Sequence, residues 1–242
     1  MKEHPAPAFD VDELRRLLVG LDRGLGRPLV DLRDRLDRLD REGGPGISAE
    51  QRAYVRSSLA LSDGLRDLTG AFFEFAVLTR APSPPALESI RLDDLVADLD
   101  RRFAATAEER ELDWDCRRAG ADALVATQTA LCRRAIGQLV ANALRFTPSG
   151  GRVGVVVERS GPDWSVTVTD DGPGIPAHAR SKVFEPFYRL ARDERAGTAG
   201  DGMGLALCKA QVDRLGGAIV LEPAEATGTR ARVTFPVAGP RA

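Results

Sequence analysis

Three segments in the C-terminal half of the sequence combine residue types that could hold a nucleotide. The first is DDGPGIP, at 170–176, directly after a predicted strand. The carboxylate of Asp170 could accept a hydrogen bond from the exocyclic amine of adenine at the lip of an apolar pocket. Gly172 and Gly174 would let the backbone turn sharply and approach the base closely. Taken alone, the segment also fits an acidic turn that ends a strand.

The second segment is QLVANALRFTP, at 138–148, on a predicted helix. Helical spacing places Asn142 on the same face as Gln138 and Arg145. An amide oxygen is a suitable ligand for magnesium, which prefers oxygen donors and is bound largely through phosphates and waters. Arg145, one turn further along, could meet a phosphate. Alone, Asn142 also fits an ordinary polar residue on a half-buried helix.

The third segment is GDGMGLAL, at 200–207, where glycines open into a predicted helix. Backbone N–H groups at a helix N-terminus, together with the helix dipole, favour an anion and would suit a triphosphate. The sequence has no Walker lysine motif, so any nucleotide site must work without one. Each segment is a weak signal alone, but the three in this order and spacing form a specific pattern.

The stretch from about Glu88 to Val237 resembles the catalytic, ATP-binding domain of sensor histidine kinases. The three segments match the asparagine box and the two glycine boxes of the wider ATPase superfamily shared with Hsp90, gyrase B and MutL. Between the glycine boxes, VFEPFYR at 183–189 is similar to the phenylalanine box, which separates histidine kinases from those relatives. Gln138 departs from the family, which often has asparagine at that position.

The resemblance implies ATP and magnesium as cofactors. Asn142 would take magnesium, Asp170 would take the adenine amine, and Gly202 and Gly204 would line the phosphates under a mobile lid at about 177–200. The ATP-binding residues that the resemblance implies are Asn142, Arg145, Phe146, Asp170, Gly172, Gly174, Ile175, Phe187, Tyr188, Gly202, Met203, Gly204 and Leu205.

The elements that must position these residues form a mixed pattern, which predicts an α+β fold. Helices beside a mostly antiparallel sheet would give an α/β sandwich. A long irregular stretch is expected from Asp170 to Gly202. Strands are expected near 89–92, 112–116, 123–126, 152–159, 164–169, 218–221 and 230–235, and helices at 93–107, 129–146 and 204–215.

Two long helices are predicted before this domain. Leucines recur at spacings of three and four from Val11 to about Arg41, as on the apolar face of an amphipathic helix. A glycine- and proline-containing break follows. Ser48 and Gln51 then form a capping box for a second helix that runs to about Thr79.

A lone two-helix hairpin cannot bury apolar stripes of this length. We therefore expect a homodimer in which two hairpins form a four-helix bundle; packing on the chain's own second domain is the alternative. The expected organisation is a disordered tail at 1–10, a dimerisation and phosphotransfer-like hairpin at 11–80, a linker at 81–87 and the catalytic ATP-binding domain at 88–242.

The hairpin resembles the family's dimerisation and phosphotransfer domain, but its chemistry is altered. Where that family has a segment close to HELRTPL, this sequence has RGLGRPL. By this alignment Arg23 replaces the phosphoacceptor histidine, Gly24 replaces the acidic general base, and Arg27 replaces the threonine used in dephosphorylation. A guanidinium stays protonated and cannot attack phosphorus. The two histidines of the chain, His4 and His178, lie in the predicted tail and lid.

Composition excludes several classes of partner and compartment. The net charge of -2 gives no electrostatic reason to expect nucleic acid or an anionic membrane. Three scattered cysteines suit a reducing cytosol. No apolar run approaches the roughly 20 residues of a membrane span, and the N-terminus does not resemble a signal peptide. A cytoplasmic protein is expected.

Three functions are compatible with these features. The favoured one is a histidine-kinase homologue that binds Mg-ATP and dimerises, does not phosphorylate itself at the usual position, and acts through a partner such as a response regulator or a true histidine kinase. The alternative is an active kinase that phosphorylates a residue on another protein. An ATP-driven clamp like Hsp90 or MutL is disfavoured by the phenylalanine box and the hairpin.

Overall fold

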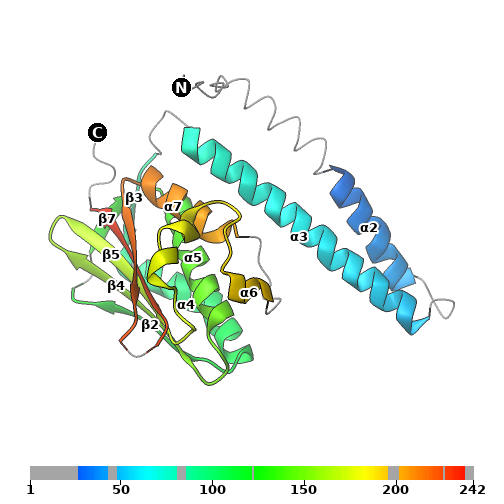
Figure 1. Ribbon diagram of the computed structural model, residues 1–242. Coiled ribbons are helices and arrows are strands. Elements are labelled where there is room, and N and C mark those ends of the chain that lie inside the picture. Colours follow the sequence, from blue (N-terminus) through cyan, green and yellow to red (C-terminus); the bar gives the residue numbers. More distant parts are fainter. Residues whose placement is uncertain are drawn as a thin grey trace, which may run out of the picture. The chain divides into compact units, whose positions relative to one another are not determined.

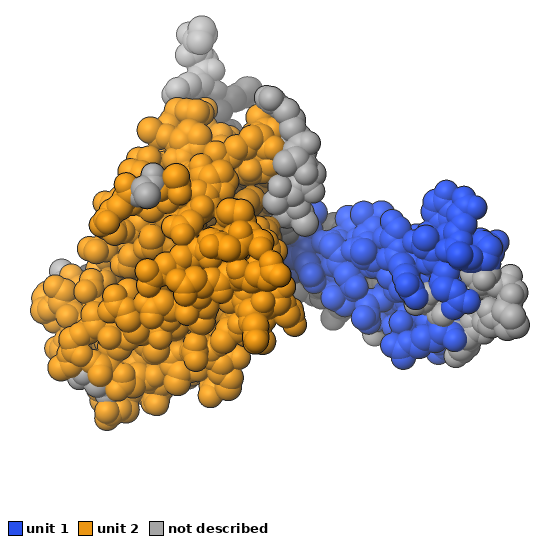
Figure 2. All heavy atoms as spheres, turned by 90° about the horizontal axis from the view of Figure 1, so that it is seen from below, with its two compact units in different colours: residues 1–80 blue, residues 81–242 orange. Residues whose placement is uncertain are grey.

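The computed structural model describes residues 27–42, 48–80, 86–121, 123–195, 202–225 and 227–237. The chain separates into two compact units, residues 1–80 and 81–242 (Figures 1 and 2). The predictions for residues 1–26, which include Arg23 and Gly24, lie outside the described residues. Among the helices of the described ranges, none has both the length and the apolar character needed to cross a membrane.

The first unit contains α2 (Arg27–Glu42) and α3 (Ala49–Arg80), which pack together as a hairpin (Figure 1). The predicted capping box starts α3. The N–H of Gln51 donates to Ser48 Oγ at 3.1 Å, and the N–H of Ser48 donates to Gln51 Oε1 at 2.9 Å. These bonds satisfy backbone donors that have no partner within the helix, which fixes the start of α3 at Ala49.

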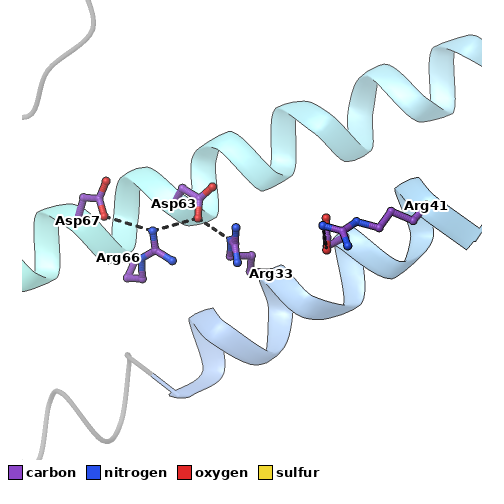
Figure 3. A network of polar contacts seen from close by, with 6 residues as sticks. Arg33, Arg41, Asp63, Arg66 and Asp67 are labelled. Atoms are coloured by element: carbon purple, nitrogen blue, oxygen red, sulfur yellow. Dashed lines mark hydrogen bonds and ion pairs between the residues drawn. The ribbon is translucent and has the colours of Figure 1, made fainter. Parts of the chain in front are cut away.

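Charged side chains connect α2 to α3. Arg33 Nε lies 2.9 Å from Asp63 Oδ1, and Arg66, one turn along α3, contacts the same oxygen at 3.3 Å (Figure 3). Arg66 also lies 3.5 Å from Asp67. The hairpin nevertheless leaves many apolar side chains uncovered. These are Val30, Leu32, Leu39, Tyr54, Leu61, Leu65, Phe72 and Val77.

The second unit is built on a five-stranded sheet with the strand order β2-β4-β5-β7-β6. β2 and β4 are parallel, and the other neighbours are antiparallel. The bounds of these strands are Asp113–Ala119 for β2, Arg152–Ser160 for β4, Asp163–Asp170 for β5, Thr229–Pro236 for β7 and Ala218–Pro223 for β6. β1 (Glu88–Arg91) and β3 (Leu124–Thr127) form a separate antiparallel pair.

Three helices cover one face of this sheet: α4 (Leu92–Glu109), α5 (Thr129–Phe146) and α7 (Gly204–Arg214) (Figure 1). Strand residues alternate between the two faces, and the buried set follows this period. On β4 the buried side chains are Val153, Val155 and Val157. Across β5 and β7 the rings of Trp164 and Phe235 lie 4.8 Å apart. The α+β sandwich predicted from the sequence is confirmed.

The stretch from 170 to 202 is more structured than the sequence predicts. It contains two short 3-10 helices, Ala177–Ala179 and Lys182–Phe184, and the five-residue helix α6 (Ala191–Arg195). The prediction of a wholly irregular stretch is therefore wrong. Elements of one turn are too short to show an apolar period in the sequence, which explains why they were missed.

Candidate nucleotide-binding site

Asp170 is the last residue of β5, the central strand of the sheet. Its Oδ1 accepts hydrogen bonds from the N–H of Gly172 at 2.9 Å and from the N–H of Thr229 at 3.2 Å. Thr229 is the first residue of β7 and pairs with Asp170 in the sheet register. The carboxylate is thus fixed from its own turn and from the neighbouring strand.

The environment of Asp170 opposes its charge. Burial raises the pKa of Asp170, and the nearby Asp171 raises it further. The N–H groups of Gly172 and Thr229 act in the opposite direction and lower this pKa, because they donate to the ionised form. Burial outweighs them, and the pKa is raised overall. Carboxylates whose pKa is shifted by burial are enriched at functional sites.

The turn after Asp170 lies against the end of α5. A Cβ on Gly172 would lie 2.8 Å from Asp170 Oδ1 and 3.2 Å from the carbonyl oxygen of Phe146, so a side chain at 172 would displace the carboxylate. Gly174 has φ +69° and its Cβ position is 2.9 Å from the carbonyl oxygen of Gly228. Both glycines are therefore required by close backbone approach.

Asn142 and Gln138 face the first residue of α7. A Cβ on Gly204 would lie 3.2 Å from Gln138 Oε1 and 3.7 Å and 3.9 Å from the two amide atoms of Asn142. The asparagine segment and the second glycine segment therefore meet. Phe146 is one turn beyond Asn142, so α5 links the turn after Asp170 to the start of α7.

The start of α7 supplies backbone donors. Met203 is fully buried at the N-cap position, and its thioether is only a weak acceptor for the N–H groups of the first turn of α7. The N–H groups of the first turn of α7 are the donors that an anion would use. Leu205, the second residue of α7, is half-buried.

A backbone hydrogen bond joins Phe187 to Gly202, two residues before α7. The N–H of Phe187 donates to the carbonyl of Gly202 at 3.1 Å. Phe187 has φ +65°, an unfavourable conformation for an aromatic residue, and its side chain is 53% exposed. Gly202 has φ +75°, and a Cβ there would lie 2.7 Å from the carbonyl carbon of Phe187. Tyr188 and Ile175 are half-buried.

Arg145 contributes to the end of α5 through its backbone. Its carbonyl accepts a hydrogen bond from Arg110 Nη2 at 3.2 Å, and its side chain is exposed. Of the altered phosphoacceptor region, only Arg27 falls within the described residues, as the first residue of α2.

Sequence reasoning missed four groups at this site. Thr229 is the first residue of β7, about 60 residues after Asp170, and Gly228 directly precedes this strand. Strand register could not be read from the sequence. Arg180 and Arg192 also contact the turn after Asp170 through its carbonyls. Their signal in the sequence is indistinguishable from that of an ordinary surface arginine.

Residues 127–239 match the family described as the histidine kinase-, DNA gyrase B-, and HSP90-like ATPase. The sensor histidine kinase RppB of Synechocystis sp. is 28% identical over 203 residues, covering 83% of this chain and 43% of the relative. The chain spans less than half the length of the curated relatives that it matches first.

Solved structures show the same fold. Full-length ShkA in complex with AMPPNP superposes with a TM-score of 0.79 at 23% identity, covering 94% of this chain and 47% of ShkA. The histidine kinase ThkA in complex with the response regulator protein TrrA gives a TM-score of 0.63 at 17% identity, covering 93% of this chain and 64% of ThkA. The two units of the chain therefore have the fold of these solved structures, and the family match is confined to residues 127–239.

Proposed function

We propose that the C-terminal unit binds Mg-ATP, with the adenine at Asp170 and the phosphates at the start of α7. The observation that carries this proposal is the meeting of three segments at α5. The Gly172 turn lies on Phe146, and Gly204 lies on Gln138 and Asn142. Sites distant in sequence thus surround one helix, as a ligand of nucleotide length requires.

At the base end, Asp170 is the residue that recognises adenine. Both backbone hydrogen bonds to this carboxylate use Oδ1, so Oδ2 is the oxygen placed to accept from the exocyclic amine. The glycine turn lets the backbone approach the flat base. A raised pKa matches this role, because the carboxylate lies where water is partly excluded.

At the phosphate end, Asn142 and the first turn of α7 act together. The amide oxygen of Asn142 is a suitable magnesium ligand beside the helix start, and phosphate oxygens and water would supply the other ligands. The N–H groups of α7 would hold the phosphates without a lysine. Magnesium would supply charge neutralisation at the phosphates.

In the hairpin, we propose that dimerisation is retained and that phosphotransfer at the usual position is lost. The uncovered apolar side chains of α2 and α3 support a second copy as partner. Arg23 and Gly24 replace the nucleophile and the base that the family uses. The chain would act through a protein partner; a response regulator is one candidate, since ThkA was solved with such a protein.

Calorimetric titration of the full chain with Mg-ADP tests the nucleotide site directly. Binding with one site per chain is expected, and no heat of binding at millimolar nucleotide would contradict the proposal. The matched control is Arg101→Gln on α4, an exposed arginine whose Nη2 lies 3.0 Å from Asp98 of the same helix. This variant should bind as the wild type does.

Incubation with labelled ATP and magnesium tests the hairpin. We expect no acid-labile phosphate on the wild type or on Arg23→His, because the base at 24 is still missing, and label on Arg23→His/Gly24→Glu. Stable label on the wild-type chain would contradict the proposed loss. The intact nucleotide site also supports a second function, transfer to another protein; ATP turnover that appears only with a partner would favour it.

A further inference from the structure

Three consecutive backbone carbonyls in the turn after Asp170 accept hydrogen bonds from arginine side chains. Arg192 Nη1 donates to the carbonyl of Pro173 at 3.2 Å, and Arg192 Nη2 donates to the carbonyl of Gly174. Arg180 Nε donates to the carbonyl of Ile175 at 3.2 Å. We name Arg180 and Arg192 the arginine clamp.

The two arginines reach the turn from different places in the chain. Arg180 directly follows the 3-10 helix Ala177–Ala179, only five residues beyond its acceptor. Arg192 lies in α6 (Ala191–Arg195), 18 residues beyond Gly174. Its Nε lies 3.3 Å from Asp193, so all three guanidinium nitrogens of Arg192 are engaged. The contact therefore ties α6 to the turn.

The clamp acts on the side of the turn that carries its carbonyls, whereas other groups fix the opposite side. The N–H of Gly172 is held by Asp170, and Gly174 is held against the backbone of Gly228. Water could satisfy exposed carbonyls, so the arginines are not needed merely to pair them. A planar guanidinium that bridges two successive carbonyls sets their direction, which single water molecules do not.

We propose that Arg180 and Arg192 are positioning residues for the adenine site, and that Arg192 couples nucleotide binding to the order of α6. The inference rests on the proposed function, in which this turn receives the base. A turn held in its binding shape binds more tightly because less order must be imposed on association. The coupling is reciprocal, so bound nucleotide stabilises the Arg192 contacts and with them α6.

Nucleotide affinity of the full chain tests the clamp. The variants are Arg192→Gln and Arg180→Gln, with Arg101→Gln as the control. We expect Arg192→Gln to weaken Mg-ADP binding by about tenfold and Arg180→Gln by less, since two charge-assisted hydrogen bonds are lost in one case and one in the other. The melting temperature without nucleotide should stay at the wild-type value, because the Arg192 side chain is 40% exposed.

Two further readouts separate positioning from a general structural role. In Arg192→Gln, the affinities for Mg-ADP and Mg-AMPPNP should fall by the same factor, because the clamp acts on the part of the site that contacts the shared adenine. Hydrogen exchange should show nucleotide-dependent protection of residues 191–195 in the wild type and not in Arg192→Gln, while protection at the start of α7 remains. Arg192→Lys, which supplies one compact donor in place of a fork, should bind with intermediate affinity.

The outcomes are distinguishable. If the wild type does not bind Mg-ADP, the proposed function fails and the clamp with it. If the wild type binds Mg-ADP and both glutamine variants bind it as tightly as the wild type does, the proposed nucleotide site stands and the clamp is overturned. If the affinities of Arg192→Gln for Mg-ADP and Mg-AMPPNP fall by different factors, the clamp is also overturned, because that result places Arg192 at the phosphates.

Discussion

At the scale of single residues, the partly buried carboxylate of Asp170 costs the fold some stability when it is ionised. Its raised pKa means that the native state takes up a proton more readily than the unfolded chain does. Its contribution to the free energy of unfolding is therefore largest below the ordinary carboxyl pKa of about 4. This contribution declines as the pH rises from that value through the raised native value.

Asp170→Asn should separate binding from stability. Asparagine keeps an acceptor oxygen for the N–H groups of Gly172 and Thr229, but it turns a donor toward the adenine amine. We expect Mg-ADP affinity to fall by about 100-fold or more. Without nucleotide, the melting temperature of the variant minus that of the wild type should be larger at pH 7 than at pH 4, because only the wild type carries the partly buried charge at pH 7. If this difference in melting temperature becomes smaller from pH 4 to pH 7, the pKa of Asp170 is not raised in the native protein.

Gly202 and Gly204 provide a matched pair of glycines with different neighbours. A Cβ at 202 meets the backbone of Phe187 and requires a positive φ, so Gly202→Ala should destabilise the protein by more than about 1 kcal/mol. A Cβ at 204 meets the movable end of Gln138. Gly204→Ala should therefore fold as the wild type does. Chemical denaturation of both variants checks this order, and equal loss would contradict it.

At the scale of elements, the capping box makes a testable contribution to the hairpin. Ser48→Ala removes the acceptor for the N–H of Gln51 and should destabilise α3 by about 1 kcal/mol. Ser57→Ala, an exposed serine inside the same helix, is the control and should be neutral or slightly stabilising. Hydrogen exchange at the first turn of α3 measures the difference. Equal exchange in the two variants would refute the role of the cap.

Elements with a local signal were predictable from the sequence, and contacts set by register were not. The bounds of α5 agree with the prediction at both ends, because its apolar period runs for five turns. The Ser48 cap is also local. The pairing of Asp170 with Thr229 depends on two strands, β5 and β7, that are separated by several helices and by β6. The contacts of Arg192 depend on a single turn of helix that carries no period.

The candidate site was predictable for a different reason. Gly172, Gly174 and Gly202 must be glycine, because a Cβ at each would meet nearby backbone. A required residue type leaves a mark in the sequence. A guanidinium that meets a carbonyl leaves none, because many exposed arginines have the same neighbours. The residues proposed to bind the nucleotide were therefore visible in the sequence, and the arginines proposed to position them were not.

At the scale of the whole molecule, the hairpin exposes an apolar surface that supports the proposed dimer. On the described part of α2 and α3, apolar side chains are exposed along the full length of both helices. The ion pair between Arg33 and Asp63 joins the two helices, and Arg66 contacts Asp63 from within α3 (Figure 3). These exposed pairs are each expected to contribute below about 1 kcal/mol, so the hairpin depends on apolar packing.

Leu61→Glu tests whether a second copy covers this surface. Leu61 is 67% exposed in the single chain, so the substitution should not disturb a monomer. In a two-fold bundle each copy would lose an apolar contact of about 1.5–3 kcal/mol and gain a charge near its equivalent, so the dimer should dissociate at micromolar concentration.

Leu124→Glu on β3, 59% exposed in the other unit, is the control and should leave the mass unchanged. Sedimentation equilibrium decides: a monomeric wild type, or a Leu61→Glu variant that stays dimeric, would exclude this part of α3 from the interface. Calorimetry on the dissociated variant should still show one Mg-ADP site per chain, because the groups proposed to contact the nucleotide all belong to residues 81–242.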